Sequence, residues 1–128
     1  MQIRVYYEDT DCGNVVYYAN YLRFMERSRT EYLRERGIDL LTWHKKGIMF
    51  VAVEAKVKYR GSARYNDLLE VESTIAELTS AAVTFITTIH RDKGPLLVRG
   101  SVRLACVGPD GHVKRIPGEI AAVLQPVS

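Results

Sequence analysis

Four segments in the second part of the chain alternate apolar and polar residues, and only short stretches separate them. They cover residues 49–60, 68–78, 81–91 and 96–107. An alternation with a period of two is typical of β-strands that bury one face. Strands joined by short turns rich in Gly, Pro, Asn and Asp pair antiparallel with one another. This part of the chain therefore predicts an antiparallel sheet of consecutive strands. The residues expected on one face are Val51, Val53, Ala55, Val57 and Tyr59 in the first segment, Leu69, Val71 and Ile75 in the second, and Leu96, Val98, Val102, Leu104 and Cys106 in the fourth.

A fifth strand and a long helix precede this sheet. Residues 2–7 alternate, which places Ile3, Val5 and Tyr7 on one side of a strand. Residues 19–37 have the spacing of an amphipathic helix, and Gly37 is a typical residue at which a helix ends. The stripe expected to face the sheet contains Tyr21, Leu22, Met25, Ser28, Tyr32 and Leu33.

The remaining segments complete an α+β chain with a single domain over residues 1–128. Residues 39–47 predict a short connection with a helical turn, and residues 116–124 predict a short C-terminal helix with Pro117 near its start. The expected fold is a five-stranded antiparallel sheet against one long helix. Because one helix covers only one face of the sheet, this fold predicts self-association.

Composition excludes several classes of protein. The net charge of +3 is mild, and no concentrated basic stripe indicates a nucleic-acid partner. No apolar stretch reaches the roughly 20 residues of a membrane span, and the N-terminus has no signal-peptide pattern. The two cysteines, Cys12 and Cys106, do not form a disulfide framework. We therefore expect a cytoplasmic protein with free thiols.

Motifs for metals and for other chemistries are incomplete. An EF-hand loop that starts at Asp9 requires different residues from Gly13, Asn14 and Asn20, and the three histidines lack the spacing of zinc ligands. No G-x-S-x-G motif is present. His112 followed by Pro117-Gly118 resembles the motif of hot-dog acyl hydratases, which then requires a glutamate where this chain has Val123. The sequence implies no metal and no cofactor.

An acidic cluster precedes the long helix: Glu8, Asp9 and Asp11 lie within four residues. One interpretation of Asp11 is an ordinary turn or capping residue. The other is a carboxylate beside the first N–H groups of the helix, which lack internal partners and can stabilise an oxyanion on a carbonyl. Such a carboxylate attacks that carbonyl or activates a water. It is a weak nucleophile, so a thioester, whose thiol leaving group has a pKa of about 8.5, is a suitable substrate.

The segment "RVYYEDTDCGNVVYYANYLRFMERSRTEYL" resembles the 4-hydroxybenzoyl-CoA thioesterase family of the hot-dog superfamily, and in particular its small bacterial Tol–Pal-associated acyl-CoA thioesterases. "VKYRGSARYNDLLEVESTI" extends the resemblance to nearly the whole chain. The resemblance implies a hot-dog fold in which the sheet wraps around the long helix. It also implies a homodimer or homotetramer with active sites between subunits, and acyl-CoA as substrate.

The resemblance also implies roles for individual residues. Asp11 is then the catalytic carboxylate, and the N–H near Tyr18 polarises the thioester carbonyl. Lys58, Arg60 and Arg64 are candidates for contacts with the phosphates of coenzyme A, or alternatively form a solvated basic edge. Further residues expected at the substrate are Gly13, Val15, Tyr21 and Tyr59, and those expected to set the depth of the acyl pocket are Phe24, Met25, Phe50 and Phe85.

Two alternatives to hydrolysis remain. The first is a non-catalytic module that binds acyl-CoA or docks on an acyl carrier protein. The intact Asp11 and the helix start argue against it, because a pure binder needs neither. The second is an acyl hydratase, which the valine at position 123 disfavours.

Overall fold

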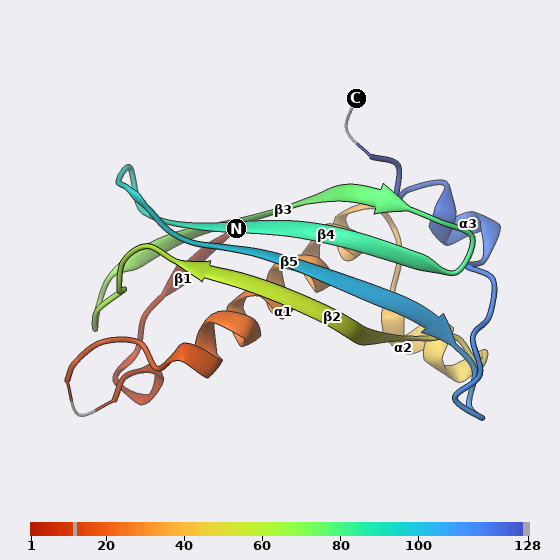
Figure 1. Ribbon diagram of the computed structural model, residues 1–128, viewed down its shortest axis with the longest axis horizontal. Helices are drawn as coiled ribbons and strands as arrows, with labels where there is room; N and C mark the ends of the chain where they lie inside the picture. Colours follow the sequence, from red (N-terminus) through yellow and green to blue (C-terminus); the bar gives the residue numbers. More distant parts are fainter. Residues whose placement is uncertain (12, 127–128) are drawn as a thin grey trace.

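The computed structural model describes residues 1–11 and 13–126, so Cys12, one of the two expected free thiols, lies outside the described residues. One long helix lies against a twisted antiparallel sheet (Figure 1), which confirms the predicted α+β fold. No helix in the described part of the chain is both long and apolar enough to cross a membrane. In chain order the elements are β1 (Gln2–Arg4), the 3₁₀ turn η1 (Tyr7–Asp9), α1 (Tyr18–Glu35), α2 (Leu40–Lys45), β2 (Met49–Tyr59), β3 (Leu68–Leu78), β4 (Ala82–Arg91), β5 (Leu96–Val107) and α3 (Gly118–Ala121).

The strand order differs from the order expected from the short connections. The sheet runs β1-β3-β4-β5-β2, so β2 pairs with β5 and not with its sequence neighbour β3. The segment between β2 and β3, residues 60–67, therefore crosses the ends of β5 and β4. Three strand spacings amount to about 14 Å, which eight extended residues span easily. This crossing leaves β2 as an edge strand of 11 residues.

A β-bulge in β2 corrects the predicted faces of that strand. The pairing register with β5 shifts between Ala52 and Glu54. One extra residue reverses the alternation beyond it. Phe50 and Ala52 face the helix before the bulge, and Val57 and Tyr59 face it afterwards. The predicted common face of Val51, Val53, Val57 and Tyr59 is therefore wrong.

The long helix has the predicted position but a different apolar stripe. Leu22 is 42% exposed, whereas Phe24 is buried. The predicted end is confirmed: Gly37 has a φ of +81°, and the Ile38 N–H returns to the Leu33 carbonyl at 2.9 Å. This αL cap lets the chain turn back toward the sheet.

The first strand is shorter than predicted. It ends at Arg4, and the 3₁₀ turn begins at Tyr7. Ile3 and Val5 are buried as expected, but Tyr7 is 73% exposed, so its predicted place on the buried face is wrong.

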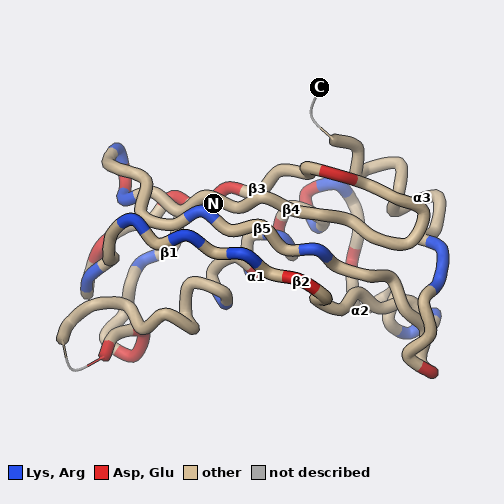
Figure 2. The backbone as a smooth tube through the Cα atoms, viewed as in Figure 1, with Lys and Arg blue, Asp and Glu red and all other residues tan. Residues whose placement is uncertain are grey.

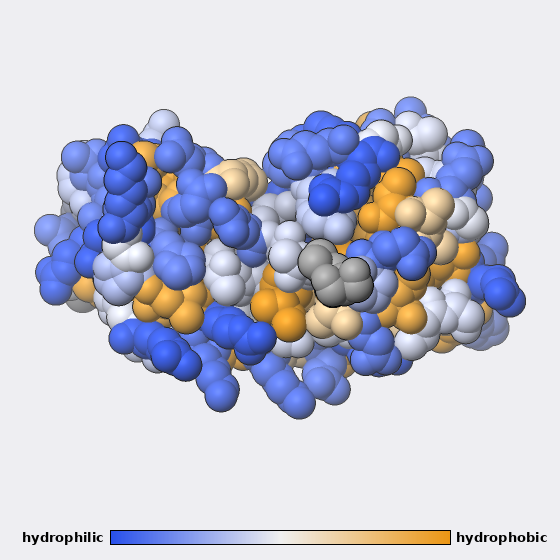
Figure 3. All heavy atoms as spheres, turned by 90° about the horizontal axis from the view of Figure 1, so that it is seen from above, coloured by the Kyte–Doolittle hydropathy of each residue, from blue (hydrophilic) through white to orange (hydrophobic). Residues whose placement is uncertain are grey.

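The core lies between α1 and the inner face of the sheet, with one apolar cluster at each end of the helix. Hydroxyl groups connect α1 to β3 and β4 between these two clusters. Ser28 bonds Ser73, and Ser73 bonds Thr87, at 2.8 Å each. The opposite face of the sheet has no helix over it in the described residues (Figure 1). Viewed from above, apolar surface appears in separate patches among hydrophilic side chains (Figure 3).

Candidate active site

The N-terminus of α1 has no side-chain cap. Tyr17 occupies the N-cap position in an extended conformation, and its side chain makes no capping hydrogen bond. The Asn20 N–H bonds the Tyr17 carbonyl, but within the described residues no acceptor takes the Tyr18 N–H. A free amide at a helix start carries partial positive charge and can donate to an incoming oxygen.

The acidic loop before the helix is held in place by backbone hydrogen bonds. The Asp11 N–H donates to the Val15 carbonyl at 3.0 Å, and the Asn14 N–H donates to the Asp11 carbonyl at 3.1 Å. The crossing segment fixes the other side, because the Val16 N–H donates to the Ala63 carbonyl at 2.9 Å and Val15 forms an isolated bridge with Arg64. Backbone hydrogen bonds therefore hold the loop that carries Asp11 against the segment that joins β2 and β3.

The clustered carboxylates point to different donors. The Gly13 N–H donates to Asp11 Oδ1 at 2.8 Å, and the Tyr6 N–H donates to Asp9 Oδ2 at 2.8 Å. A Cβ at Gly13 would lie 3.3 Å from that Asp11 oxygen, a tight contact that glycine avoids. The Asp11 side chain is exposed in the single protomer, and Oδ2 has no hydrogen-bond partner among the described residues.

Asn20 is a positioning residue that the sequence pattern did not predict as part of the site. Its Nδ2 donates to the Asp9 carbonyl at 2.8 Å, and the Tyr17 N–H donates to the same oxygen at 3.1 Å. The buried Asn20 side chain thus ties the acidic loop to the first turn of α1. The available signal was an asparagine at an inward position in the first turn of the helix.

A row of tyrosine rings lines the helix start. Tyr18 is 64% exposed, and its ring centroid lies 4.9 Å from that of Tyr59, which in turn lies 5.6 Å from Tyr21. Tyr21 is only 1% exposed, and its hydroxyl accepts the Ala63 N–H at 2.9 Å. Burial raises the pKa of Tyr21, and burial followed by the neighbouring Tyr18 raises the pKa of Tyr59. The buried Tyr21 therefore holds the segment between β2 and β3 in place through Ala63. Its predicted contact with substrate stays a prediction.

The three basic candidates lie at the end of β2 and in the crossing segment that follows it. Arg64 belongs to the crossing segment and bridges to Val15 beside the acidic loop. Arg60 follows the end of β2 and is exposed. Lys58 alternates with the inward Val57 and Tyr59, so it faces the outer side of the sheet, where it pairs with Arg99 in register. Basic residues line this part of β2 and β5 (Figure 2).

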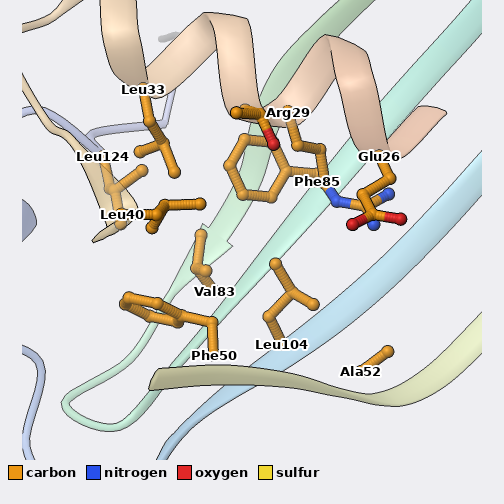
Figure 4. A pocket seen from close by; sticks show the side chains of 11 residues that line it. Glu26, Arg29, Leu33, Leu40, Phe50, Ala52, Val83, Phe85, Leu104 and Leu124 are labelled. Atoms are coloured by element: carbon orange, nitrogen blue, oxygen red, sulfur yellow. The ribbon is translucent and has the colours of Figure 1, made fainter. Parts of the chain in front are cut away.

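A cavity of about 310 Å³ lies between the second half of α1 and the sheet (Figure 4). It has the mainly apolar lining and small number of polar groups that ligand sites share. The head groups of Glu26 and Arg29 lie at the end near Ala52, while leucines close the opposite end. Two of the predicted pocket residues, Phe50 and Phe85, line it; the other two, Phe24 and Met25, belong to the core cluster at the other end of the helix. The lining consists of Glu26, Arg29, Thr30, Leu33, Leu40, Phe50, Ala52, Val83, Phe85, Leu104 and Leu124.

Within one protomer this cavity is remote from the helix start. Tyr18 and Arg29 are eleven residues apart on α1, which corresponds to about 16 Å along the axis. Neither Asp11 nor Tyr18 lines the cavity.

Comparisons with known proteins identify the class. Residues 5–124 match the model of the Thioesterase-like superfamily. "Acyl-CoA thioester hydrolase YbgC" from Escherichia coli O6:H1 is 37% identical over 107 residues, which is 84% of this chain and 80% of the relative. "Acyl-CoA thioesterase YbgC" from Haemophilus influenzae is 41% identical over 106 residues, which is 82% of this chain and 77% of the relative. A crystal structure of a hypothetical protein from Aquifex aeolicus aligns with a TM-score of 0.92 at 26% identity over 98% of each chain.

The fold and the family match together define a hot-dog protein of the thioesterase class. The chain belongs to the Thioesterase-like superfamily, as its sequence resemblance implied.

Proposed function

We propose that this protein hydrolyses acyl-CoA thioesters to a free acid and coenzyme A, with Asp11 as the catalytic carboxylate. The observation that carries the proposal is the start of α1, which has no side-chain cap, beside a loop that backbone hydrogen bonds hold in place and that presents Asp11. Relatives named as acyl-CoA thioester hydrolases support the choice of substrate.

In this proposal the Tyr18 N–H donates to the thioester carbonyl oxygen and stabilises the negative charge that develops there. The Gly13 N–H holds one oxygen of Asp11, which leaves the other oxygen to act. It either attacks the carbonyl carbon or removes a proton from an attacking water. The thiolate of coenzyme A then departs without a strong acid, because a thiol such as that of cysteine has a pKa of about 8.5. If Asp11 attacks the carbonyl carbon, a mixed anhydride is left on its carboxyl group, and water hydrolyses this anhydride to the free acid and restores Asp11.

The acyl group occupies the cavity beside α1, and a second subunit brings the two parts of the site together. Tyr18 lies beside Tyr59 at the C-terminal end of β2, whereas the cavity lies beside Phe50 and Ala52 near its N-terminal end. A two-fold axis through the middle of an antiparallel β2–β2 pair exchanges these ends. The partner's Tyr18 then lies next to this cavity. In the described residues one edge of β2 has no strand partner, and this edge together with the exposed Val51 and Val53 favours such pairing.

Arg64 is the best placed of the basic residues for the phosphates of coenzyme A. Its bridge to Val15 keeps it beside the acidic loop, and its exposed guanidinium can form charge-assisted hydrogen bonds with phosphate oxygens.

A panel of short-chain, long-chain and aromatic acyl-CoA substrates with thiol detection tests the proposal. We expect thiol release by the wild-type protein. We expect Asp11→Asn to lower kcat by roughly 10²-fold or more, as expected when the acting carboxylate is removed. The amide oxygen of asparagine can still accept the Gly13 N–H, so the melting temperature should stay within about 1 °C of the wild-type value.

Glu8→Gln is the matched control, because it makes the same chemical change in the same loop at an exposed residue. It should retain wild-type kcat. Full turnover in Asp11→Asn would contradict the role of Asp11, and binding of acyl-CoA without thiol release by the wild type would contradict hydrolysis altogether.

A further inference from the structure

Asp67 and Arg91 form an ion pair at the segment that crosses from β2 to β3. Arg91 Nε donates to Asp67 Oδ2 at 3.2 Å, and Arg91 Nη2 donates to the Ser62 carbonyl at 3.1 Å. The Arg64 N–H donates to the same Asp67 oxygen at 2.9 Å. The ion pair therefore holds both ends of the turn formed by residues 62–67.

The sheet fixes the guanidinium that holds this turn. Arg91 is the last residue of β4, where it pairs in register with Leu69 of β3, and its N–H donates to the Pro95 carbonyl at 3.2 Å. Paired residues of neighbouring strands project to the same face, so Arg91 lies on the side of the fully buried Leu69. A guanidinium donates two hydrogen bonds in a planar, fixed geometry. Arg91 therefore sets the position of residues 62–67 relative to the sheet.

The middle of the same turn holds the loop that carries Asp11. Residues 63–65 make three backbone contacts with that loop, and both segments lie at the same end of the molecule (Figure 1). These contacts are the Val16 N–H to the Ala63 carbonyl at 2.9 Å, the bridge between Val15 and Arg64, and the Tyr65 N–H to the Asn14 carbonyl at 3.3 Å. The Asn14 N–H in turn donates to the Asp11 carbonyl at 3.1 Å. A displacement of residues 63–65 is therefore passed on to Asp11.

The ion pair has more influence on geometry than on stability. The side chains of Arg91 and Asp67 are 39% and 23% exposed, so water screens their attraction and limits what the pair adds to the free energy of unfolding. A reacting group, in contrast, must lie in place very accurately: a displacement of about 1 Å can lower a rate roughly 100-fold.

We infer that Asp67 and Arg91 are positioning residues that set the place of Asp11 through residues 63–65. The inference rests on the proposed function and names the residues that hold its catalytic carboxylate. The two side chains act on the reaction only through the position of Asp11.

Arg91→Met tests the inference, because it removes both hydrogen bonds and keeps a long side chain. We expect kcat to fall by roughly 10-fold to 100-fold, while the melting temperature falls by less than about 5 °C. KM for acyl-CoA should change by less than about threefold. An acyl-pantetheine thioester, which lacks the nucleotide and its phosphates, should show the same loss of kcat.

Asp67→Asn is the second variant, since it keeps the shape and an acceptor for the Arg64 N–H but removes the charge that holds Arg91. It should lower kcat in the same direction. Arg36→Met is the matched control: the Nη1 of Arg36 also donates to a backbone carbonyl, that of Tyr32 at 3.0 Å, but just beyond the opposite end of α1. It should retain wild-type kcat.

The double variant Arg91→Met with Asp11→Asn shows whether Arg91 acts through Asp11. Its residual rate should be within about threefold of that of Asp11→Asn alone, because a misplaced carboxylate that is already absent costs nothing further. A loss by the same factor in both backgrounds would overturn the inference, since the ion pair would then act independently of Asp11.

Two further outcomes would also overturn it. Wild-type kcat in both Arg91→Met and Asp67→Asn would show that Asp11 does not depend on the pair. A loss with acyl-CoA but not with acyl-pantetheine would assign Arg91 to a phosphate contact instead. Either result, in a wild type that releases thiol and depends on Asp11, defeats this inference alone, whereas an inactive wild type defeats the proposed function together with it.

Discussion

The hydrogen bond between Tyr21 and Ala63 connects the core to the acidic loop, and its removal has a calculable effect. Tyr21→Phe keeps the ring and deletes the hydroxyl that accepts the Ala63 N–H at 2.9 Å. Both residues are buried, with Tyr21 1% and Ala63 0% exposed. Because both residues are buried, water does not replace the deleted hydroxyl as acceptor for the Ala63 N–H.

The cost follows from the unsatisfied donor. A buried N–H that loses its acceptor destabilises a protein by about 1–3 kcal/mol. For a chain of this size, 1 kcal/mol lowers the melting temperature by roughly 3–5 °C. We therefore expect Tyr21→Phe to melt about 3–15 °C below the wild type. Activity should fall as well, because the Ala63 carbonyl holds the Val16 N–H at the base of the loop that carries Asp11.

Urea unfolding and thermal melts at one fixed protein concentration measure the effect. Tyr32→Phe is the matched control: it makes the same change on the same helix, at a half-buried tyrosine whose hydroxyl has no hydrogen bond in the described residues. It should alter stability by less than about 0.5 kcal/mol. Equal stabilities of the two variants would refute the assignment of this hydrogen bond as a support of the site.

Two further predictions concern the core. Gly100→Ala should destabilise the protein by about 1–3 kcal/mol in a urea titration, because its Cβ would overlap the sulfur of the fully buried Met25, whereas Gly118→Ala has open space and should be neutral. Burial raises the pKa of the Cys106 thiol above 9.0, with a smaller opposing effect of Lys114. The unfolded chain therefore loses this proton first, and stability should fall as pH rises through about 9, with a slope of up to about 1.4 kcal/mol per pH unit. Cys106→Ala should show a shallower fall, and identical pH profiles would contradict the protected thiol.

Local patterns predicted the elements of this fold well. The period of two in residues 68–78 placed Leu69, Val71 and Ile75 on the buried face, and all three are at most 3% exposed. Gly37 ends the long helix because the αL conformation suits glycine. These features depend on residues close together in the chain, so the sequence itself contains the information.

Long-range features were not predictable in this way. The sequence cannot reveal that β2 pairs with β5, because a crossing segment of eight residues reads like an ordinary turn. It gives no sign of the extra residue near Val53, which turns Val51 and Val53 away from the helix. Arg29 reads as a solvated helix charge, and only the packing of α1 over the sheet buries its Nη1.

The sequence by itself determined the secondary-structure elements, the family and the acidic loop, since each depends on neighbouring residues or on a matching segment. The tertiary structure alone decided which strand lies at the edge of the sheet, which tyrosine is buried and which arginine nitrogen is buried. Those properties arise from contacts between segments distant in the chain, where burial and pairing, not local preference, set the free energy.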